Sequence, residues 1–232
     1  MPDFRRRSTE LEMLDHPGQF SSGVLSQTYR EINFINKYLL GDYFLQNDLI
    51  RLLMGYPTKT LTLLDLGCGN GNLLRKLQLA LKPLGFRVIG VGFDPYLESI
   101  GDKFQTEDLH LYSDWNQLVA RHPIDIAITS LTLHHLYDEV LAEALHRLMV
   151  APRYGFVISD LVRSPIAYYL IKGMTAVFSR SDLVKNDAPL SVCRGFSRAD
   201  MVAMSLVAEP GTHIQIQQNI AFRWHIIGRK TV

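Results

Sequence analysis

Cysteine is scarce in this chain of 232 residues, which has only Cys68 and Cys193. Two cysteines cannot build a disulfide framework and do not suggest a zinc cluster, so a reducing compartment is the simplest expectation. A surplus of charge is also lacking, because 24 Lys and Arg residues oppose 23 Asp and Glu residues. Proteins that neutralise nucleic-acid phosphates need a surplus of cations, so this class is disfavoured.

Long apolar runs are missing as well. The most lipophilic segment, residues 164–179, is interrupted by Lys172 and Gly173, and no uncharged stretch reaches the length of about 18 residues that a spanning helix needs. The chain begins Met-Pro-Asp-Phe-Arg-Arg-Arg with no apolar stretch behind these charges, which is unlike a signal peptide. We therefore expect a cytoplasmic protein without stable membrane insertion.

What the chain does have is enough apolar side chains to bury a core, since 47% of its residues are hydrophobic and 20% are charged. That balance excludes disorder of the whole chain, and the length suggests one domain with an appendage. Apolar residues recur at helical spacing over residues 26–54, with a break at Gly41-Asp42. We expect residues 1–58 to form an N-terminal helical cap and residues 59–232 to form a single globular unit.

Short apolar runs alternate with amphipathic ones beyond residue 60. Strands that alternate with helices predict a parallel sheet covered on both faces. Near the C-terminus, runs at 213–217 and 221–227 are close enough to pair as an antiparallel hairpin. The expected fold class is therefore α/β and Rossmann-like. The five earlier strands are expected at residues 61–65, 87–93, 109–112, 124–128 and 156–159.

The segment Asp65-Leu66-Gly67-Cys68-Gly69-Asn70-Gly71 lies between the first expected strand and a helix. Its glycines allow a tight turn and a close approach to a ligand, and the helix that follows presents unpaired N–H groups. The loop lacks the Lys-Ser/Thr of a phosphate-binding loop, and its spacing differs from the G-x-G-x-x-G of dinucleotide folds. The carboxylate of Asp65 would repel a pyrophosphate and favours a cationic group such as an ammonium or a sulfonium.

Two further acids follow expected strands. Asp94 stands 94 − 71 = 23 positions after Gly71, at a strand end where a carboxylate can accept hydrogen bonds from both ribose hydroxyls. Asp114 follows the third strand and precedes Trp115; it can accept from an adenine amino group, or it can cap the next helix. Together with Asp65, these acids predict a pocket for a nucleoside that carries a cationic tail.

The segments 65–71, 92–94 and 114–115 resemble, in order and spacing, successive motifs of class I S-adenosylmethionine-dependent methyltransferases, and residues 126–136 resemble the fourth-strand motif of that family. The resemblance implies a seven-stranded, mostly parallel sheet with an antiparallel last strand. It also implies S-adenosyl-L-methionine as the cofactor and S-adenosyl-L-homocysteine as the product. The cofactor-binding residues that it implies are Asp65, Gly67, Cys68, Gly69, Gly71, Asp94, Pro95, Asp114, Trp115, Ser130 and Leu131.

A narrower resemblance lies outside these motifs. Residues 7–15, 31–36 and 187–192, together with Phe196, are similar to a bacterial subgroup that accompanies type III polyketide synthases and is presumed to methylate phenolic or quinone-like products. This resemblance implies a small-molecule substrate that is phenolic, quinone-like or polyketide-derived, with methylation on oxygen or carbon. No nucleic-acid partner is expected, and self-association as a homodimer stays open.

His134 and His135 follow the fourth expected strand, at the edge where ligands approach such a sheet. Either one can act as a general base towards a phenol or form a wall of the pocket, and the pair can equally be a hydrogen-bonded structural feature. No other metal-binding side chain stands at a suitable spacing, so no metal site is expected. His135 and His134 are the candidate catalytic residues.

Two other segments are candidates for shaping the pocket. Residues 180–195 are rich in Ser, Asp, Asn and Pro and predict a long loop, which in a compact domain is more often a functional lid than an idle connector. We expect it to cover the site together with the N-terminal helices. The preceding helix carries Tyr168, Tyr169, Met174 and Phe178, for which core packing is the default and a hydrophobic substrate wall or a shallow membrane contact is the alternative.

Other functions compete with methyl transfer to a small molecule. A non-catalytic sensor or scaffold would bind the same cofactor without turnover. A nicotinamide-dependent reductase is disfavoured by the acid at position 65. Methylation of RNA or protein is disfavoured because the net charge is nearly zero and no Asn/Asp-Pro-Pro-Tyr motif follows the fourth strand.

Overall fold

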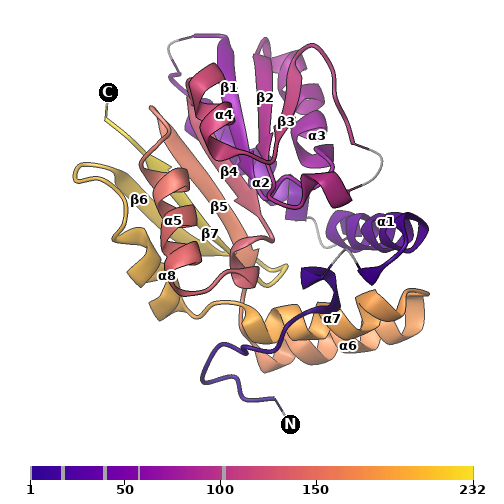
Figure 1. The fold of residues 1–232 in the computed structure, drawn as a ribbon. Coiled ribbons are helices and arrows are strands. Elements are labelled where there is room, and N and C mark those ends of the chain that lie inside the picture. The colour runs from indigo at the N-terminus through magenta and orange to yellow at the C-terminus, as the bar shows by residue number, and fades with distance from the viewer. Residues whose placement is uncertain (1, 17–18, 39–40, 57, 101–102, 232) are drawn as a thin grey trace.

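The computed structural model describes residues 2–16, 19–38, 41–56, 58–100 and 103–231 (Figure 1). Its centre is a seven-stranded sheet in the order β3-β2-β1-β4-β5-β7-β6. Strands β1 to β5 are parallel, β7 runs antiparallel to β5, and β6 pairs antiparallel with β7. The expected α/β class with an antiparallel last strand is confirmed. The strands are β1 Thr60–Leu66, β2 Arg87–Phe93, β3 Leu109–Tyr112, β4 Ile126–Ser130, β5 Gly155–Leu161, β6 His213–Gln218 and β7 Arg223–Arg229.

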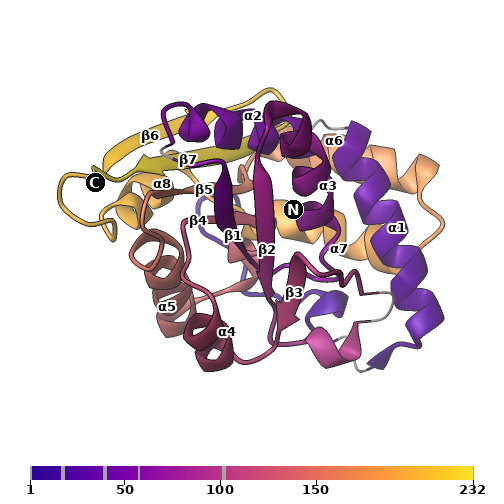
Figure 2. The ribbon, with the colours of Figure 1, turned by 90° about the horizontal axis from the view of Figure 1, so that it is seen from above.

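Helices cover both faces of the sheet (Figure 2). Side chains of α4, α5 and α8 share one buried cluster with Leu64 and Ala127, whereas those of α2 and α3 share a second cluster with Leu63 and Ile126. Neighbouring residues of one strand thus belong to opposite cores, as expected for strands that are buried on both faces. These helices are α2 Gly41–Leu53, α3 Asn72–Leu81, α4 Trp115–Arg121, α5 Asp138–Met149 and α8 Arg198–Ser205.

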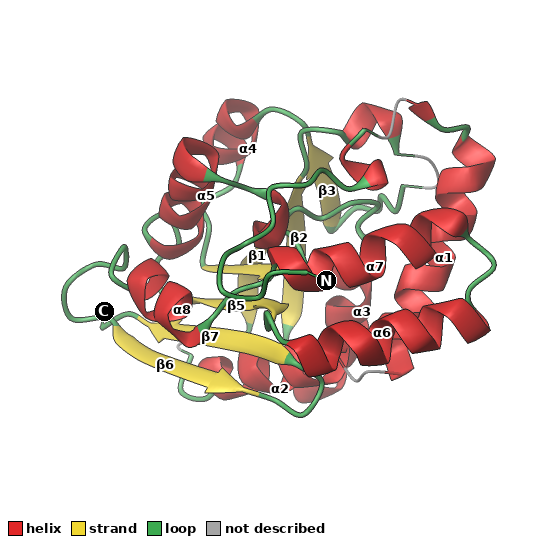
Figure 3. Ribbon diagram, turned by 90° about the horizontal axis from the view of Figure 1, so that it is seen from below, coloured by secondary structure: helices red, strands yellow, loops and turns green. Residues whose placement is uncertain are grey.

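The remaining long helices gather beyond the carboxyl ends of the parallel strands (Figures 1 and 3). Helix α6 packs on α7, and α7 packs on α1 and on η1, a short 3-10 turn near the N-terminus. In a sheet of this kind, ligands bind at the carboxyl ends of the strands. This layer is therefore positioned to shape a site. Its elements are η1 Met13–Asp15, α1 Ser22–Tyr38, α6 Pro165–Phe178 and α7 Asp182–Arg194.

The expected N-terminal cap, residues 1–58, contains two different parts. Leu45, Leu49 and Leu52 of α2 are buried in the same cluster as Leu61 of β1. Helix α2 therefore belongs to the core of the sheet. The described part of the chain before α2 also contacts α7, through η1 and α1, so this outer part is placed to cover a site at the strand ends.

One expected loop is a helix. Residues 180–195, whose Ser, Asp, Asn and Pro predict a loop, contain α7. The prediction is wrong because polar residues of this segment cap the helix or bind the N-terminal segment. The hydroxyl of Ser181 caps its first turn, and the carboxylate of Asp187 accepts hydrogen bonds from the N–H groups of Met13 and Leu14.

Helix α6 is more exposed than expected. Of its side chains, Ala167 and Thr175 are buried, whereas Tyr169 and Phe178 are 51% and 76% exposed. Core packing is therefore the wrong default for this helix, because α7 covers only part of its apolar surface. In the described part of the chain, no helix is long and apolar enough to cross a membrane.

Candidate active site

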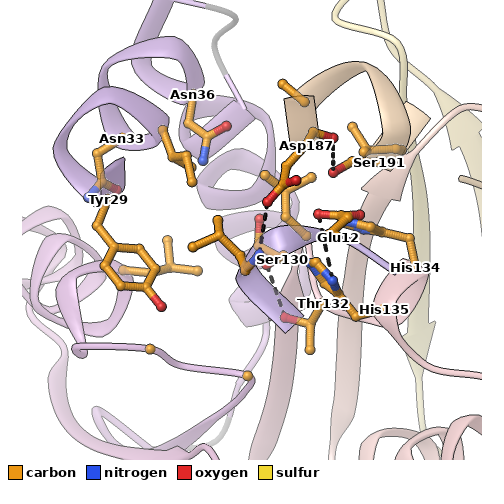
Figure 4. A pocket seen from close by; sticks show the side chains of 18 of the residues that line it. Glu12, Tyr29, Asn33, Asn36, Ser130, Thr132, His134, His135, Asp187 and Ser191 are labelled. Carbon is orange, nitrogen blue, oxygen red and sulfur yellow. Dashed lines mark hydrogen bonds and ion pairs between the residues drawn. The ribbon is translucent and has the colours of Figure 1, made fainter. Parts of the chain in front are cut away.

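A cavity of about 830 Å³ lies at the carboxyl ends of the central strands (Figure 4). Its walls come from the glycine loop after β1, the turn after β4, the N-terminal segment, α1, α6 and α7. Ten of the thirteen residues that the sequence singled out line this cavity. These ten are Asp65, Gly67, Cys68, Gly69, Asp94, Pro95, Ser130, Leu131, His134 and His135.

The loop after β1 takes a conformation that depends on its glycines. Gly67, Gly69 and Gly71 have φ angles of +80°, +53° and +82°, which L side chains rarely adopt. A Cβ at Gly67 would lie 2.3 Å from the side chain of Thr132, so the turn after β4 can approach the loop only because this residue is glycine. A Cβ at Gly69 would meet nothing within 4 Å, so the loop leaves room for a ligand there.

Asp65 is a buried acid near the end of β1, and only 2% of it is exposed. Burial raises its pKa to about 8, and the negative charges of Asp94 and Asp42 add to the rise. Its Oδ1 is buried without a hydrogen-bond partner among the residues that the structure describes. An unpartnered buried oxygen is costly, so this group is suited to a cationic ligand that enters the cavity.

Asp94 follows β2 and faces the glycine loop. Its Oδ2 accepts a hydrogen bond from the N–H of Gly69 at 3.0 Å, and its Oδ1 accepts one from the N–H of Tyr96 at 2.9 Å. Burial raises the pKa of this carboxyl group. Tyr29 of α1 also lines the cavity, and burial together with the charge of Asp94 raises its pKa. Sequence reasoning missed Tyr29, because an aromatic residue on an amphipathic helix is most often part of a core.

Three expected residues, Gly71, Asp114 and Trp115, are not among those that line the cavity. Asp114 is exposed and caps α4, where its Oδ1 accepts a hydrogen bond from the N–H of Asn116 at 2.8 Å. The ring of Trp115 packs edge-on against that of Phe93, with 5.6 Å between centroids. Gly71 precedes α3 as its N-cap. For Asp114, the structure therefore shows the helix-capping alternative.

The two histidines after β4 pack against each other, with 4.2 Å between ring centroids and an angle of 37° between the ring planes. His134 is buried, and its Nδ1 lies 2.7 Å from Oδ1 of Asp160 near the end of β5. Burial opposes ionisation of Asp160, but its interactions with His134 outweigh this effect and lower its pKa. The other oxygen of Asp160 accepts from the N–H of Leu133 at 2.8 Å. These bonds are those expected if His134 is a hydrogen-bonded structural residue and not a general base. No sequence pattern indicated Asp160.

His135 has a side chain that is 29% exposed and lines the cavity. Its Nδ1 lies 2.8 Å from Oδ1 of Asp15 in η1, and Oδ2 of Asp15 lies 2.5 Å from Nη1 of Arg194. Burial opposes ionisation of Asp15, but the hydrogen bonds from His135 and Arg194 outweigh it and lower its pKa. An ionised Asp15 holds a proton on Nδ1 and leaves Nε2 as the basic nitrogen.

Glu12 completes this cluster from the residue before η1. Its carboxylate oxygens lie 3.9 Å from Nε2 of His134, 3.8 Å from Nδ1 of His135 and 3.5 Å from Nη1 of Arg194. Burial raises its pKa to about 7, against the opposing effects of His135, Ser191 and Arg194. Ligand atoms of Glu12 and both histidines lie within 4.8 Å of one another, so the three could hold a metal ion. Sequence spacing missed this group because Glu12 lies far upstream, and the cation of Arg194 would compete with a metal.

Charged side chains fix the N-terminal segment to the site. Asp187 of α7 accepts hydrogen bonds from the N–H groups of Met13 and Leu14, both at 2.9 Å. Arg7 donates to the carbonyl oxygen of His134 at 3.0 Å. Figure 4 shows Asp187, Glu12 and the histidines around the same cavity. Two of the segments that carried the narrower resemblance thus contact each other and the histidine turn.

Solved methyltransferase structures have a similar fold. The plantazolicin methyltransferase BpumL in complex with SAH (S-adenosylhomocysteine) matches with a TM-score of 0.63 over 90% of each chain, at 13% identity. Magnesium protoporphyrin IX methyltransferase (ChlM) from Synechocystis PCC 6803, with bound SAH, matches with a TM-score of 0.52 over 82% of this chain and 84% of that chain, at 14% identity. At such identities the likeness shows the fold.

Sequence comparison identifies the family. The family description "Methyltransferase domain" matches residues 36–224, which include α2, the glycine loop and the histidine pair. Because the match spans most of the chain, the protein belongs to this methyltransferase family. No curated protein sequence matches the chain.

Proposed function

We propose that the protein is an S-adenosylmethionine-dependent methyltransferase that acts on the oxygen or carbon of a small phenolic, quinone-like or polyketide-derived molecule. The observation that carries this proposal is one cavity that joins two carboxylates beside a glycine loop to a histidine oriented by an acid. Asp65 and Asp94 are the two carboxylates, and Asp15 orients His135. Membership of the methyltransferase family supports the type of reaction.

The residues around the glycine loop fit this cofactor. Asp94 would accept hydrogen bonds from the ribose hydroxyls, and the unpartnered oxygen of Asp65 would meet a positive group. Pro95 and Leu131 line the cavity and would pack against the adenine. When bound, the cofactor supplies a methyl group on a sulfonium, which an attacking oxygen or carbon receives in line.

His135 is placed to take the proton that a phenol loses as its oxygen attacks. Asp15 holds Nδ1, so Nε2 is the nitrogen that accepts this proton. A general base of this kind contributes about 10²- to 10⁴-fold in rate. Asp15 and Arg194 act through His135 and are positioning residues. Holding the attacking atom and the methyl group in near-attack geometry supplies a further share of the barrier reduction, up to about 7–11 kcal/mol.

The apolar part of the cavity wall favours a hydrophobic substrate. Apolar side chains of α1, α6, α7 and the turn before β7 line it, and they are supplied by Ile32, Ile171, Met174, Val184 and Phe222. Apolar pockets with a few polar groups bind small organic molecules, and a phenol offers both a flat ring and one polar atom. Helix α6 would thus form part of a hydrophobic wall for the substrate, one of the alternatives that its sequence left open.

We further propose that the outer N-terminal segment and α7 form the lid of this site. Glu12, Leu14 and Asp15 line the cavity from one side, and Asp187 and Ser191 line it from α7. A covered site excludes water, which prevents hydrolysis and proton leakage during transfer. In this division, the sheet and α2 hold the cofactor, and the segment before α1 completes the substrate pocket together with α7.

A direct assay tests the proposed function. Purified protein is incubated with S-adenosylmethionine and a panel of phenols, quinones and pyrone-type polyketide products, and the methylated products and S-adenosylhomocysteine are quantified by mass spectrometry. We expect equal amounts of both products with at least one phenolic compound. A protein that binds the cofactor tightly but methylates no member of the panel would instead be a sensor or scaffold, which contradicts the proposal.

A further inference from the structure

Arg223, the first residue of β7, is a buried cation in the wall of the cavity. Only 2% of it is exposed, and it is one of the lining residues. Its Nη2 donates to Oδ1 of Asn36 at 2.9 Å and its Nη1 to Oγ of Ser130 at 3.4 Å. Its Nε is buried and has no hydrogen-bond partner among the described residues. Both partners of this guanidinium are neutral, so its charge is left without a counter-ion in direct contact.

The carboxylates around Arg223 are engaged elsewhere. Asp42, also in the cavity wall, pairs with Lys76 at 2.7 Å, and Asp160 pairs with His134 at 2.7 Å. Within the described ranges, no carboxylate oxygen lies within the 4.0 Å of an ion pair with Arg223. Burial accordingly lowers the pKa of the guanidinium. Removing a charge from water without pairing it is unfavourable, so the fold keeps this arginine at a cost.

Three elements, α2, α1 and β4, surround the guanidinium. A Cβ at Gly41, the first residue of α2, would lie 2.6 Å from Cζ of Arg223, so a side chain there would displace the arginine. Asn36 comes from α1 and Ser130 from the end of β4. Figure 4 shows Asn36 and Ser130 on the walls of the cavity. This arrangement is a built site rather than a surface arginine that has folded inward.

Asp65 is an acidic group in the same cavity. Like Arg223, it is buried and carries an atom without a partner, Oδ1. The two residues do not form an ion pair with each other. A cavity whose wall holds a buried carboxyl group, which a cationic ligand would ionise, and a separate uncompensated cation is complementary to a ligand that is itself zwitterionic.

We propose that Arg223, supported by Asn36, binds the carboxylate of the amino-acid part of the cofactor, while Asp65 binds its ammonium group. This inference rests on the proposed function and adds to it the residue that recognises the carboxylate. A carboxylate of the substrate has the same chemistry, and the experiment separates the two sources.

The test compares two ligands that differ only in the amino-acid part. S-adenosylhomocysteine has the ammonium and carboxylate groups, and 5′-methylthioadenosine lacks both. Calorimetry measures their dissociation constants with the natural protein and with Arg223→Met, Asn36→Ala and Arg163→Met. Arg163 is the matched control, because its side chain is 6% exposed, pairs with Asp200 and is not among the cavity-lining residues.

We expect Arg223→Met to weaken the binding of S-adenosylhomocysteine by about 10- to 100-fold, which is the effect of losing a charged hydrogen bond. The affinity for 5′-methylthioadenosine should stay unchanged. Asn36→Ala should weaken the binding of S-adenosylhomocysteine by a smaller factor, and Arg163→Met should change the affinity for neither ligand. The natural protein should itself prefer S-adenosylhomocysteine to 5′-methylthioadenosine, a comparison that needs no variant to fold.

Three results would overturn the inference. Arg223→Met could bind S-adenosylhomocysteine as tightly as the natural protein. It could also lose affinity for both ligands equally, which would indicate a structural role. It could also keep the affinity for S-adenosylhomocysteine and raise KM only for carboxylated substrates, which would assign the arginine to the substrate. If the natural protein bound neither adenosyl ligand, the proposed function would fail as well, whereas equal binding of both ligands would remove this inference alone.

Discussion

Nδ1 of His135 lies 2.8 Å from Oδ1 of Asp15, although 120 positions of sequence separate the two residues. The histidine belongs to the turn after β4, and the aspartate belongs to a 3-10 turn that Asp187 of α7 holds in place. The proposed base is therefore completed by a part of the chain outside the sheet. This arrangement predicts that changes in the N-terminal segment alter methyl transfer more than they alter binding of the cofactor.

Asp15→Asn tests this dependence. The substitution keeps the shape but removes the charge that orients His135, so we expect kcat on a phenol to fall and cofactor affinity to change little. His135→Ala should lower kcat by about 10²- to 10⁴-fold, most at low pH, where the phenol itself is least ionised. Glu10→Gln, an exposed carboxylate on the same segment, is the control. An Asp15→Asn enzyme with the natural kcat would show that the contact is only structural.

Asp187→Ala tests how the segment is held. The variant loses two hydrogen bonds from the N–H groups of Met13 and Leu14 to a carboxylate, which are worth about 1.5–3 kcal/mol each when fully formed. We expect faster proteolysis of the first twenty residues, a lower kcat and nearly unchanged affinity for S-adenosylhomocysteine. Asp182→Ala, an exposed acid in the first turn of the same helix, should change none of these. Equal proteolysis of both variants would refute the docking role.

Asp94 and Asp114 form a matched pair of predictions. Asp94→Ala should weaken cofactor binding by about 10- to 100-fold, because it removes charge-assisted hydrogen bonds worth about 1.5–3 kcal/mol. Asp114→Ala should leave this affinity unchanged and instead lower the free energy of unfolding by about 0.5–2 kcal/mol, as expected for a lost helix cap. Calorimetry and denaturant titration measure the two effects. A loss of cofactor affinity in Asp114→Ala would show that this residue contacts the cofactor in addition to capping α4.

The pKa of Asp65 gives a pH prediction with a definite sign. In the free protein its pKa is raised to about 8, chiefly by burial, so at pH 7 most of the protein carries a proton there. An ammonium group of the ligand favours the ionised carboxylate, so binding at pH 7 releases a proton. Affinity for S-adenosylhomocysteine should therefore rise from pH 6 to pH 8 and level off above that.

Calorimetry in buffers of different ionisation enthalpy counts the released protons. Asp65→Asn cannot ionise at this position, so it should bind more weakly and lose the proton release. Natural protein that takes up protons on binding, or an Asp65→Asn variant that keeps the same pH dependence, would show that another group responds to the ligand.

The sheet could be predicted because it depends on local apolar runs. The second and third strands lie at residues 87–93 and 109–112, as expected. The fourth was expected at 124–128 and lies at Ile126–Ser130. The residue just before it, Asp125, accepts a hydrogen bond from the N–H of Thr62 at 2.9 Å. Periodicity cannot show a hydrogen bond to a residue this distant in sequence.

The site was only partly predictable for the same reason. The glycine loop and Asp94 are local motifs that follow strands, and both lie in the cavity. Asp15 and Arg194 stand in polar segments without a pattern, and they gain a role only when folding brings them to the histidines. Asp114 shows the converse, because one local pattern describes both a helix cap and a ligand contact, and the structure shows the cap.

The most direct test of the central claim is a crystal structure of the protein with S-adenosylhomocysteine. We expect the adenosyl group against the loop of residues 67–71, with both ribose hydroxyls within hydrogen-bond distance of Asp94 and the ammonium group at Asp65. The homocysteine sulfur should face the part of the cavity that contains His135. A crystal grown at saturating ligand with the cavity vacant, or with the ligand bound elsewhere, would contradict the account.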